Sequence, residues 1–207
     1  MSGTPPAAKV VPNVRTSEKE HPMHATIHRF RGPLGPHDLA GGALGAATLT
    51  ELGGQAGAVV TFWPDAAAAG AAAARRPAGT TWLDAGAYRV ADVHSASDAA
   101  AYAQLTWFDG PKSADQSAAE QRAGRERIWP AVRGIEGVGT TYALLAEDRS
   151  LVVVGFTASL ATVEAVQEAI MATELLPGED PALLPGPDRV DLHRVRHAAL
   201  PAPAGAR

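Results

Sequence analysis

Residues 24–33 read HATIHRFRGP, and residues 102–111 read YAQLTWFDGP; this pair of segments decides the fold. Along each segment the side chains alternate in character, which is typical of a β-strand. Each alternation ends at a Phe-x-Gly-Pro sequence, because Gly and Pro terminate regular structure. The two segments therefore mark the first strands of two similar units.

Two further matches follow in the same order along the chain. Val59–Phe62 precedes an Ala-rich helix as Val152–Gly155 precedes the helix near 165–170, and Tyr88–Val90 matches Val190–Leu192. Chance similarity in a chain rich in Ala and Val is the alternative, but three matches in order favour an internal repeat. Each unit has the order β-α-β-β-α-β, which is the ferredoxin-like order.

We therefore predict an α+β fold of two tandem ferredoxin-like (βαββαβ) repeats, packed sheet to sheet as an intramolecular α+β barrel. The predicted boundaries are a disordered N-terminal arm at 1–21, repeat 1 at 22–96, repeat 2 at 101–197 and a disordered tail at 198–207. Repeat 1 has a shortened first helix, weak and broken by glycines, at 36–47. In repeat 2 the first helix is expected to end at Pro130.

Composition excludes several classes of protein. With 46% hydrophobic and 19% charged residues, the 207-residue chain can bury a core. A formal net charge of -4 argues against a nucleic-acid partner, and the absence of Cys excludes disulfides and thiol catalysis. No apolar run approaches the roughly 18 residues of a membrane span, and no signal pattern opens the chain. We expect a soluble, cytoplasmic protein without a membrane partner.

Two short motifs carry a resemblance to a known superfamily. Phe62-Trp63-Pro64-Asp65 places an aromatic-Trp pair at the end of a strand, just before an acid-capped helix. Ile128-Trp129-Pro130 ends a helix, and Gly137-Val138 leads into the next strand. In both respects the chain resembles the dimeric α+β barrel superfamily, in its antibiotic-biosynthesis-monooxygenase-like branch. The resemblance implies two four-stranded sheets packed face to face with helices outside. The chain would then be a monomeric pseudo-dimer, and a further homodimer stays open.

The resemblance also bears on cofactors. Haem-degrading members of the superfamily use a strand Asn, a Trp in the position of Trp63, and a His on the following helix. Here that helix has no His, the first strand has no Asn, and Thr157 stands where the second Trp would be. The resemblance therefore favours the members that work without a cofactor, such as monooxygenases and polyketide cyclases.

Strand alternation predicts a binding face. Each strand directs alternate side chains to one side, and we expect the polar and aromatic ones to line the barrel while the aliphatic ones face the helices. A largely aromatic wall with a few polar groups is typical of a small-molecule pocket. A solid barrel, or one side facing water, is the alternative. The predicted lining residues are His24, Thr26, His28, Phe30, Tyr102, Gln104, Thr106 and Phe108, with Tyr88 and Tyr142 as further residues that could stack on an aromatic ligand.

Histidines are the candidates for proton transfer. His28 is the first candidate for a general base, because imidazole titrates near neutral pH. His94 is the second, and Asp92 could orient it, although side chains two residues apart on a strand are separated by roughly 7 Å. His24 and His28 could form half a metal site, but no carboxylate cluster completes it, so no metal is expected. The charged stretch 120–127 is expected to be a solvated helix face.

Together with the predicted pocket, the resemblance implies an enzyme of secondary metabolism that acts on an aromatic or polyketide-type small molecule. It would be monooxygenase-like or cyclase-like and work without metal or flavin. The alternative is a non-catalytic small-molecule-binding or stress-related α+β barrel, with haem binding less favoured.

Overall fold

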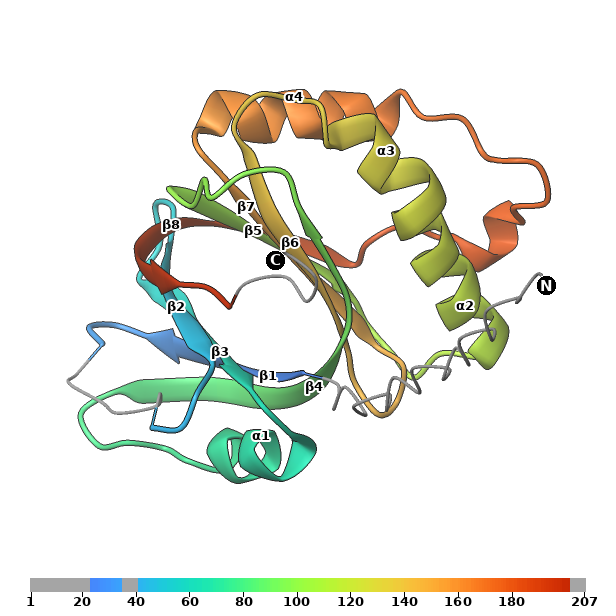
Figure 1. Ribbon diagram of the computed structural model, residues 1–207. Helices are drawn as coiled ribbons and strands as arrows, with labels where there is room; N and C mark the ends of the chain where they lie inside the picture. Colours follow the sequence, from blue (N-terminus) through green and yellow to red (C-terminus); the bar gives the residue numbers. More distant parts are fainter. Residues whose placement is uncertain (1–22, 35–40, 202–207) are drawn as a thin grey trace, which may run out of the picture.

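The computed structural model describes residues 23–34 and 41–201. They form a mixed α+β fold around one closed barrel of eight antiparallel strands (Figure 1). The strands are β1 (His24–Arg31), β2 (Gly45–Glu51), β3 (Ala56–Trp63), β4 (Thr81–Ser95), β5 (Tyr102–Phe108), β6 (Val138–Leu145), β7 (Leu151–Thr157) and β8 (Arg189–Ala199).

The order of the strands shows how the barrel closes. The first four lie side by side as β4-β1-β3-β2, and the last four as β8-β5-β7-β6. Two antiparallel pairings, β2 with β8 and β4 with β6, join these sheets. The barrel that the sequence predicts is therefore closed within one chain.

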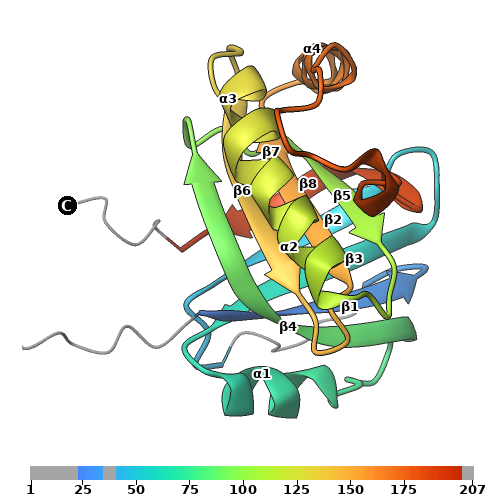
Figure 2. The same ribbon diagram turned by 90° about the vertical axis from the view of Figure 1, so that its right-hand side faces the viewer.

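The helices lie outside the barrel on two opposite sides (Figure 2). On one side α1 contacts β1 and β4, and on the other α2, α3 and α4 cover the sheet of the second half. Side chains of Asp65, Ser113 and Ser159 cap α1, α2 and α4 by accepting hydrogen bonds from backbone N–H groups. The helical segments are α1 (Ala66–Ala73), α2 (Ala114–Ala123), the π-helical turn η1 (Gly124–Ile128), α3 (Trp129–Val132), α4 (Leu160–Met171) and the short 3-10 helix η2 (Pro181–Leu183).

Two helix predictions need correction. Of the helix predicted at 36–47, residues 45–47 open strand β2, and 35–40 lie outside the described residues. The helix predicted to end at Pro130 continues to Val132. Pro130 has no N–H, and the π-helical turn before it widens the backbone so that the helix passes through the proline.

The chain termini differ partly from the sequence prediction. Residues 1–21 and 202–207, predicted to be disordered, lie outside the described residues. Strand β8 reaches Ala199, so 198–199 belong to the barrel rather than to a loose tail. The carbonyl of Pro201 accepts a hydrogen bond from the hydroxyl of Tyr142, at 3.1 Å.

The barrel interior is a packed apolar core. Tyr142 is fully buried in it and packs against Phe62, with ring centroids 4.4 Å apart. The buried residues of this core come from seven strands: Ala25, Ile27, Ala47, Leu49, Ala58, Val60, Phe62, Val90, Ala103, Leu105, Trp107, Tyr142, Leu144, Val152, Val154 and Phe156. The prediction that the polar face lines the interior is therefore wrong, because the aliphatic face fills it.

Candidate functional site

A cavity of about 530 Å³ lies outside the barrel, between the sheet of the second half and its helices. Strands β5, β6 and β7 form its floor, α2, η1, α3 and α4 form its roof, and residues 181–187 line one side. Val153, Ile128, Val163 and Ile170 make much of its wall apolar. Its size and character are those of a site for a small organic molecule.

A β-bulge in β4 brings two of the predicted residues to this cavity. Tyr88, Val90 and Val93 pack against the barrel core. The register with β6 shifts between Val90 and Asp92, so Ala91 is an extra residue. The bulge reverses the alternation, and Asp92 and His94 therefore face the cavity. In a regular strand Tyr88, Val90, Asp92 and His94 would share one face, and the bulge divides them between the core and the cavity.

Asp92 and His94 form a cluster with two residues of the helix above them. The Nε2 atom of His94 lies 3.6 Å from Oδ2 of Asp92, and Nη1 of Arg125 lies 3.4 Å from the same oxygen. The His94 ring stacks on Trp129, with centroids 4.9 Å apart and an angle of 17° between the planes. The predicted pair is therefore brought together, and Arg125 and Trp129 are additions that sequence reasoning missed.

Three of the four residues predicted on β5 also reach the cavity. Gln104, Thr106 and Phe108 line it, and Nε2 of Gln104 donates to Oγ1 of Thr106 at 3.0 Å. They lie under the helices, whereas the sequence analysis predicted them inside the barrel. Tyr102 is placed elsewhere: its ring faces the guanidinium of Arg194, 5.2 Å from the ring centroid.

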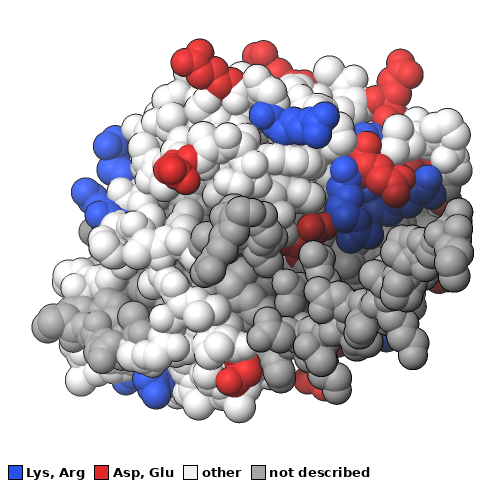
Figure 3. Space-filling view, in the orientation of Figure 1, with Lys and Arg blue, Asp and Glu red and all other residues white. Residues whose placement is uncertain are grey.

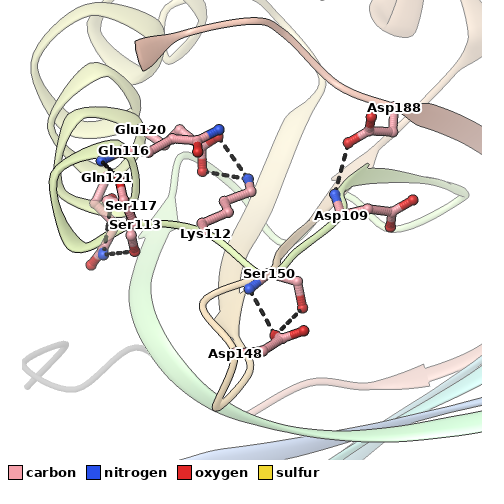
Figure 4. Close-up of polar contacts among 10 residues, drawn as sticks. All are labelled: Asp109, Lys112, Ser113, Gln116, Ser117, Glu120, Gln121, Asp148, Ser150 and Asp188. Carbon is pink, nitrogen blue, oxygen red and sulfur yellow. Dashed lines mark hydrogen bonds and ion pairs between the residues drawn. The ribbon is translucent and has the colours of Figure 1, made fainter.

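A buried ion pair lies at the α2 side of the cavity (Figure 4). Nζ of Lys112 donates to both carboxylate oxygens of Glu120, at 2.7 and 2.6 Å. Lys112 is held by its backbone, since its N–H bonds to the carbonyl of Asp148 and its carbonyl accepts from Arg149. Glu120 lines the cavity, so the stretch predicted as a solvated helix face is solvated only in part.

The other charges on this helix divide between surface and cavity. Arg122 and Glu126 form an exposed i,i+4 pair, as expected of a solvated helix face. Basic and acidic side chains lie side by side on the face that carries α2 and α3 (Figure 3). Arg127 points inward instead, where its Nε lies 2.9 Å from Oε2 of the buried Glu179 and its Nη1 donates to Thr173. This ion pair therefore fastens the loop 176–187 to the helical stretch.

In the first half the predicted lining residues lie on the helix side of the sheet, not in the barrel. Nε2 of His28 lies 3.0 Å from the carbonyl oxygen of Ala72 in α1. Thr26 accepts a hydrogen bond from Nε1 of Trp63, which packs against α1. His24 shares this face by strand alternation. The prediction that His28 is a base inside the barrel is therefore wrong.

The composition of α1 explains this arrangement. Its sequence AAAAGAAA supplies almost no side-chain volume, so the sheet beneath must supply the bulk that fills the layer. Trp63 packs on the helix, and Phe30 packs beside Val59 and Trp82. His28 thus lies between the sheet and the helix, and Phe30 belongs to a small apolar cluster with Val59 and Trp82.

Tyr88 and Tyr142, predicted to contact a ligand, do not line the cavity. Both pack in or against the barrel core. Burial raises the pKa of each phenol to about 12. Both are therefore neutral in the physiological range and serve the core.

Among residues 23–34 and 41–201, no cluster of three His, Asp or Glu side chains could hold a metal ion. The described part of the cavity wall does not fit haem either: His94 is its one histidine, and it directs Nε2 at Asp92. None of the described helices is long and apolar enough to cross a membrane.

Comparison with known proteins shows the fold. No protein-family model and no curated sequence matches the chain. An anthrone oxidase-like protein of known structure matches with a TM-score of 0.57 and 11% identity, over 87% of this chain and 94% of that one. A ferredoxin-fold protein from Listeria monocytogenes, related to antibiotic biosynthesis monooxygenases, matches with a TM-score of 0.52 and 8% identity, over 86% and 97%. The chlorite dismutase of Candidatus Nitrospira defluvii matches with a TM-score of 0.55 and 11% identity, over 86% and 91%.

The chain is thus similar in fold to monooxygenase-related ferredoxin-fold proteins and to chlorite dismutases. At these identities the similarity concerns the fold alone. The reaction must be argued from the cavity.

Proposed function

We propose that the cavity binds an aromatic, polyketide-type small molecule and that the chain is a monooxygenase-like or cyclase-like enzyme. The observation that carries this proposal is the cluster at its β4 side. A β-bulge turns His94 into an apolar cavity, where Asp92 and Trp129 hold its ring. Nothing else in the described wall places an imidazole on a rigid aromatic support.

The geometry of His94 suits proton abstraction from carbon or oxygen. Nε2 faces the carboxylate of Asp92, which would stabilise the imidazolium that forms, and Nδ1 would accept the proton from the substrate. Arg125 lies against the same carboxylate and holds it in place. His94 would be the catalytic base, with Asp92 and Arg125 as positioning residues.

Deprotonation would make an activated aromatic substrate electron-rich enough to react with dioxygen. For an anthrone, a methylene group would become a carbonyl; one oxygen atom enters the product and the other leaves as water. The anthrone oxidase-like fold relative and the apolar wall support this choice of test substrate. In a cyclase, the same base would start an aldol closure without oxygen.

The test is oxygen consumption with anthrone. We expect His94→Asn to lower turnover by about a hundredfold or more, since general bases contribute roughly that factor. His197→Asn, an exposed histidine on β8, is the matched control and should keep full activity. Equal turnover in the wild-type protein and His94→Asn would contradict the assignment. Binding without turnover in the wild-type protein would favour the non-catalytic binding alternative.

We also infer that the two halves arose by duplication. This inference is supported by the strand order that the halves share, β4-β1-β3-β2 and β8-β5-β7-β6, and by the repeated Phe-x-Gly-Pro segments. The second half expressed alone, with its β6 and β8 edges unpaired, would then form a homodimeric barrel. Light scattering that shows a monomer or an aggregate at all concentrations would contradict this.

A further inference from the structure

The cavity carries polar groups at two separate places along its roof. Glu120 of α2 and Trp129 of α3 lie on one continuous helical stretch, nine residues apart. At 1.5 Å per residue this is about 13 Å along the helix. His94 stacks on Trp129, so Glu120 marks the end of the cavity away from the proposed base.

The Lys112–Glu120 pair is costly to bury. The side chains are 4% and 6% exposed, and no other ion pair among the described residues is buried on both sides to this extent. Replacing such a pair by apolar residues of similar size is often neutral or stabilising, so stability alone does not account for it. The two members of the pair differ in their access to the cavity: Glu120 lines it, and Lys112 does not.

The hydrogen-bond inventory of the pair defines what it can bind. Two donors of Lys112 point at Glu120, and Nζ lies 5.0 Å from the centroid of the Phe108 ring. The carboxylate can accept about four hydrogen bonds, and Lys112 fills two of these positions. The acceptor positions that Lys112 leaves unfilled therefore favour a donor on the ligand and disfavour a carboxylate or phosphate.

We propose that Glu120 is the specificity-determining residue of the cavity, and that it accepts a hydrogen bond from a neutral hydroxyl group on the ligand. The ligand would be an elongated, fused-ring aromatic molecule with this hydroxyl at the end away from His94. The inference rests on the proposed function of the cavity as a small-molecule site. An apolar group packed against this carboxylate would exclude water from its remaining acceptor positions without replacing the hydrogen bonds, so an analogue that lacks the hydroxyl binds more weakly.

Two stable probes of nearly equal size test the proposal: hydroxymethylanthraquinone and ethylanthraquinone, substituted at the same carbon of a terminal ring. Neither is ionised at neutral pH. Dissociation constants from isothermal titration calorimetry should favour the hydroxymethyl probe by about tenfold or more in the wild-type protein.

The double variant Lys112→Met/Glu120→Leu removes the acceptor without stranding a charge. It should bind both probes equally or prefer the ethyl probe. Arg122→Met/Glu126→Leu makes the same changes to the exposed pair on the same helix and should keep the wild-type preference. If the first double variant does not fold, Glu120→Gln takes its place, and its preference should fall as well because the amide adds a donor.

The outcomes separate the two proposals. Equal affinities in the wild-type protein, or an unchanged preference without the Glu120 carboxylate, would overturn the role of Glu120 while the cavity keeps its proposed function. Failure of both probes to bind the wild-type protein would overturn both.

Discussion

The imidazole of His94 lies almost flat on the indole of Trp129, with ring centroids 4.9 Å apart. The two residues come from opposite walls of the cavity, His94 from β4 and Trp129 from the start of α3. Their contact joins the sheet to the helix at the point where we place the proton transfer. It fixes the ring from one face while Asp92 fixes one edge.

Removing the indole should therefore lower turnover more than stability. We expect Trp129→Leu to reduce turnover of anthrone by about tenfold, because the freed imidazole samples unproductive orientations. In the His94→Asn background the same change should cost nothing further, since the two residues act together. Independent losses in the double variant would show that Trp129 acts elsewhere.

His28 should matter for stability and not for the cavity. His28→Ala removes the contact between its Nε2 and the carbonyl of Ala72 and leaves a space between β1 and α1. We expect the free energy of unfolding to fall by about 1–3 kcal/mol in urea titrations. Affinity for the aromatic probes should not change. A loss of ligand binding in folded His28→Ala would show that the first half of the chain belongs to the binding site.

His193 should make the protein less stable in mild acid. Burial is the largest effect on this side chain and lowers its pKa below the usual value near 6.5. The unfolded chain therefore binds the proton first, and stability should fall as the pH drops below about 6.5, by at most about 1.4 kcal/mol per pH unit. His193→Gln should lose this part of the pH dependence, and the exposed His197→Gln should keep it. The same dependence of stability on pH in the wild-type protein, His193→Gln and His197→Gln would contradict this role of His193.

The Arg127–Glu179 pair should hold the loop 176–187 in place. Arg127→Met leaves the Glu179 carboxylate buried without its cation, which we expect to cost about 3 kcal/mol or to release the loop. Limited proteolysis should then cut within 176–187 faster than in the wild-type protein. The double variant Arg127→Met/Glu179→Met should recover much of the resistance. Unchanged cleavage in Arg127→Met would show that other contacts hold the loop.

Much of the barrel could be predicted from the sequence. The Phe-x-Gly-Pro segments and the alternating strands near 24–30 and 102–108 mark strand positions directly, since alternation and turn residues are local signals. Which face of β1 and β5 points inward could not be predicted this way. Alternation separates the side chains of a strand into two faces, but side-chain volume decides which face points inward. The narrow barrel accommodates the aliphatic side chains.

The site could be predicted only in part. Asp92 and His94 were recognisable as a pair, but the bulge at Ala91 that aims them at the cavity leaves no clear mark in the sequence. Arg125 and Trp129 join them through tertiary packing of the helix on the sheet. Glu120 looked like a surface charge, because sequence patterns do not show that Lys112, before the helix, buries it.

The most direct test of the account is a crystal structure of the protein with hydroxymethylanthraquinone bound. We predict the ring system between β5–β6–β7 and α2–α3, with one end against His94 and the hydroxyl within hydrogen-bond distance of Glu120. A ligand inside the barrel, or on the α1 side beside His28, would contradict the central claim.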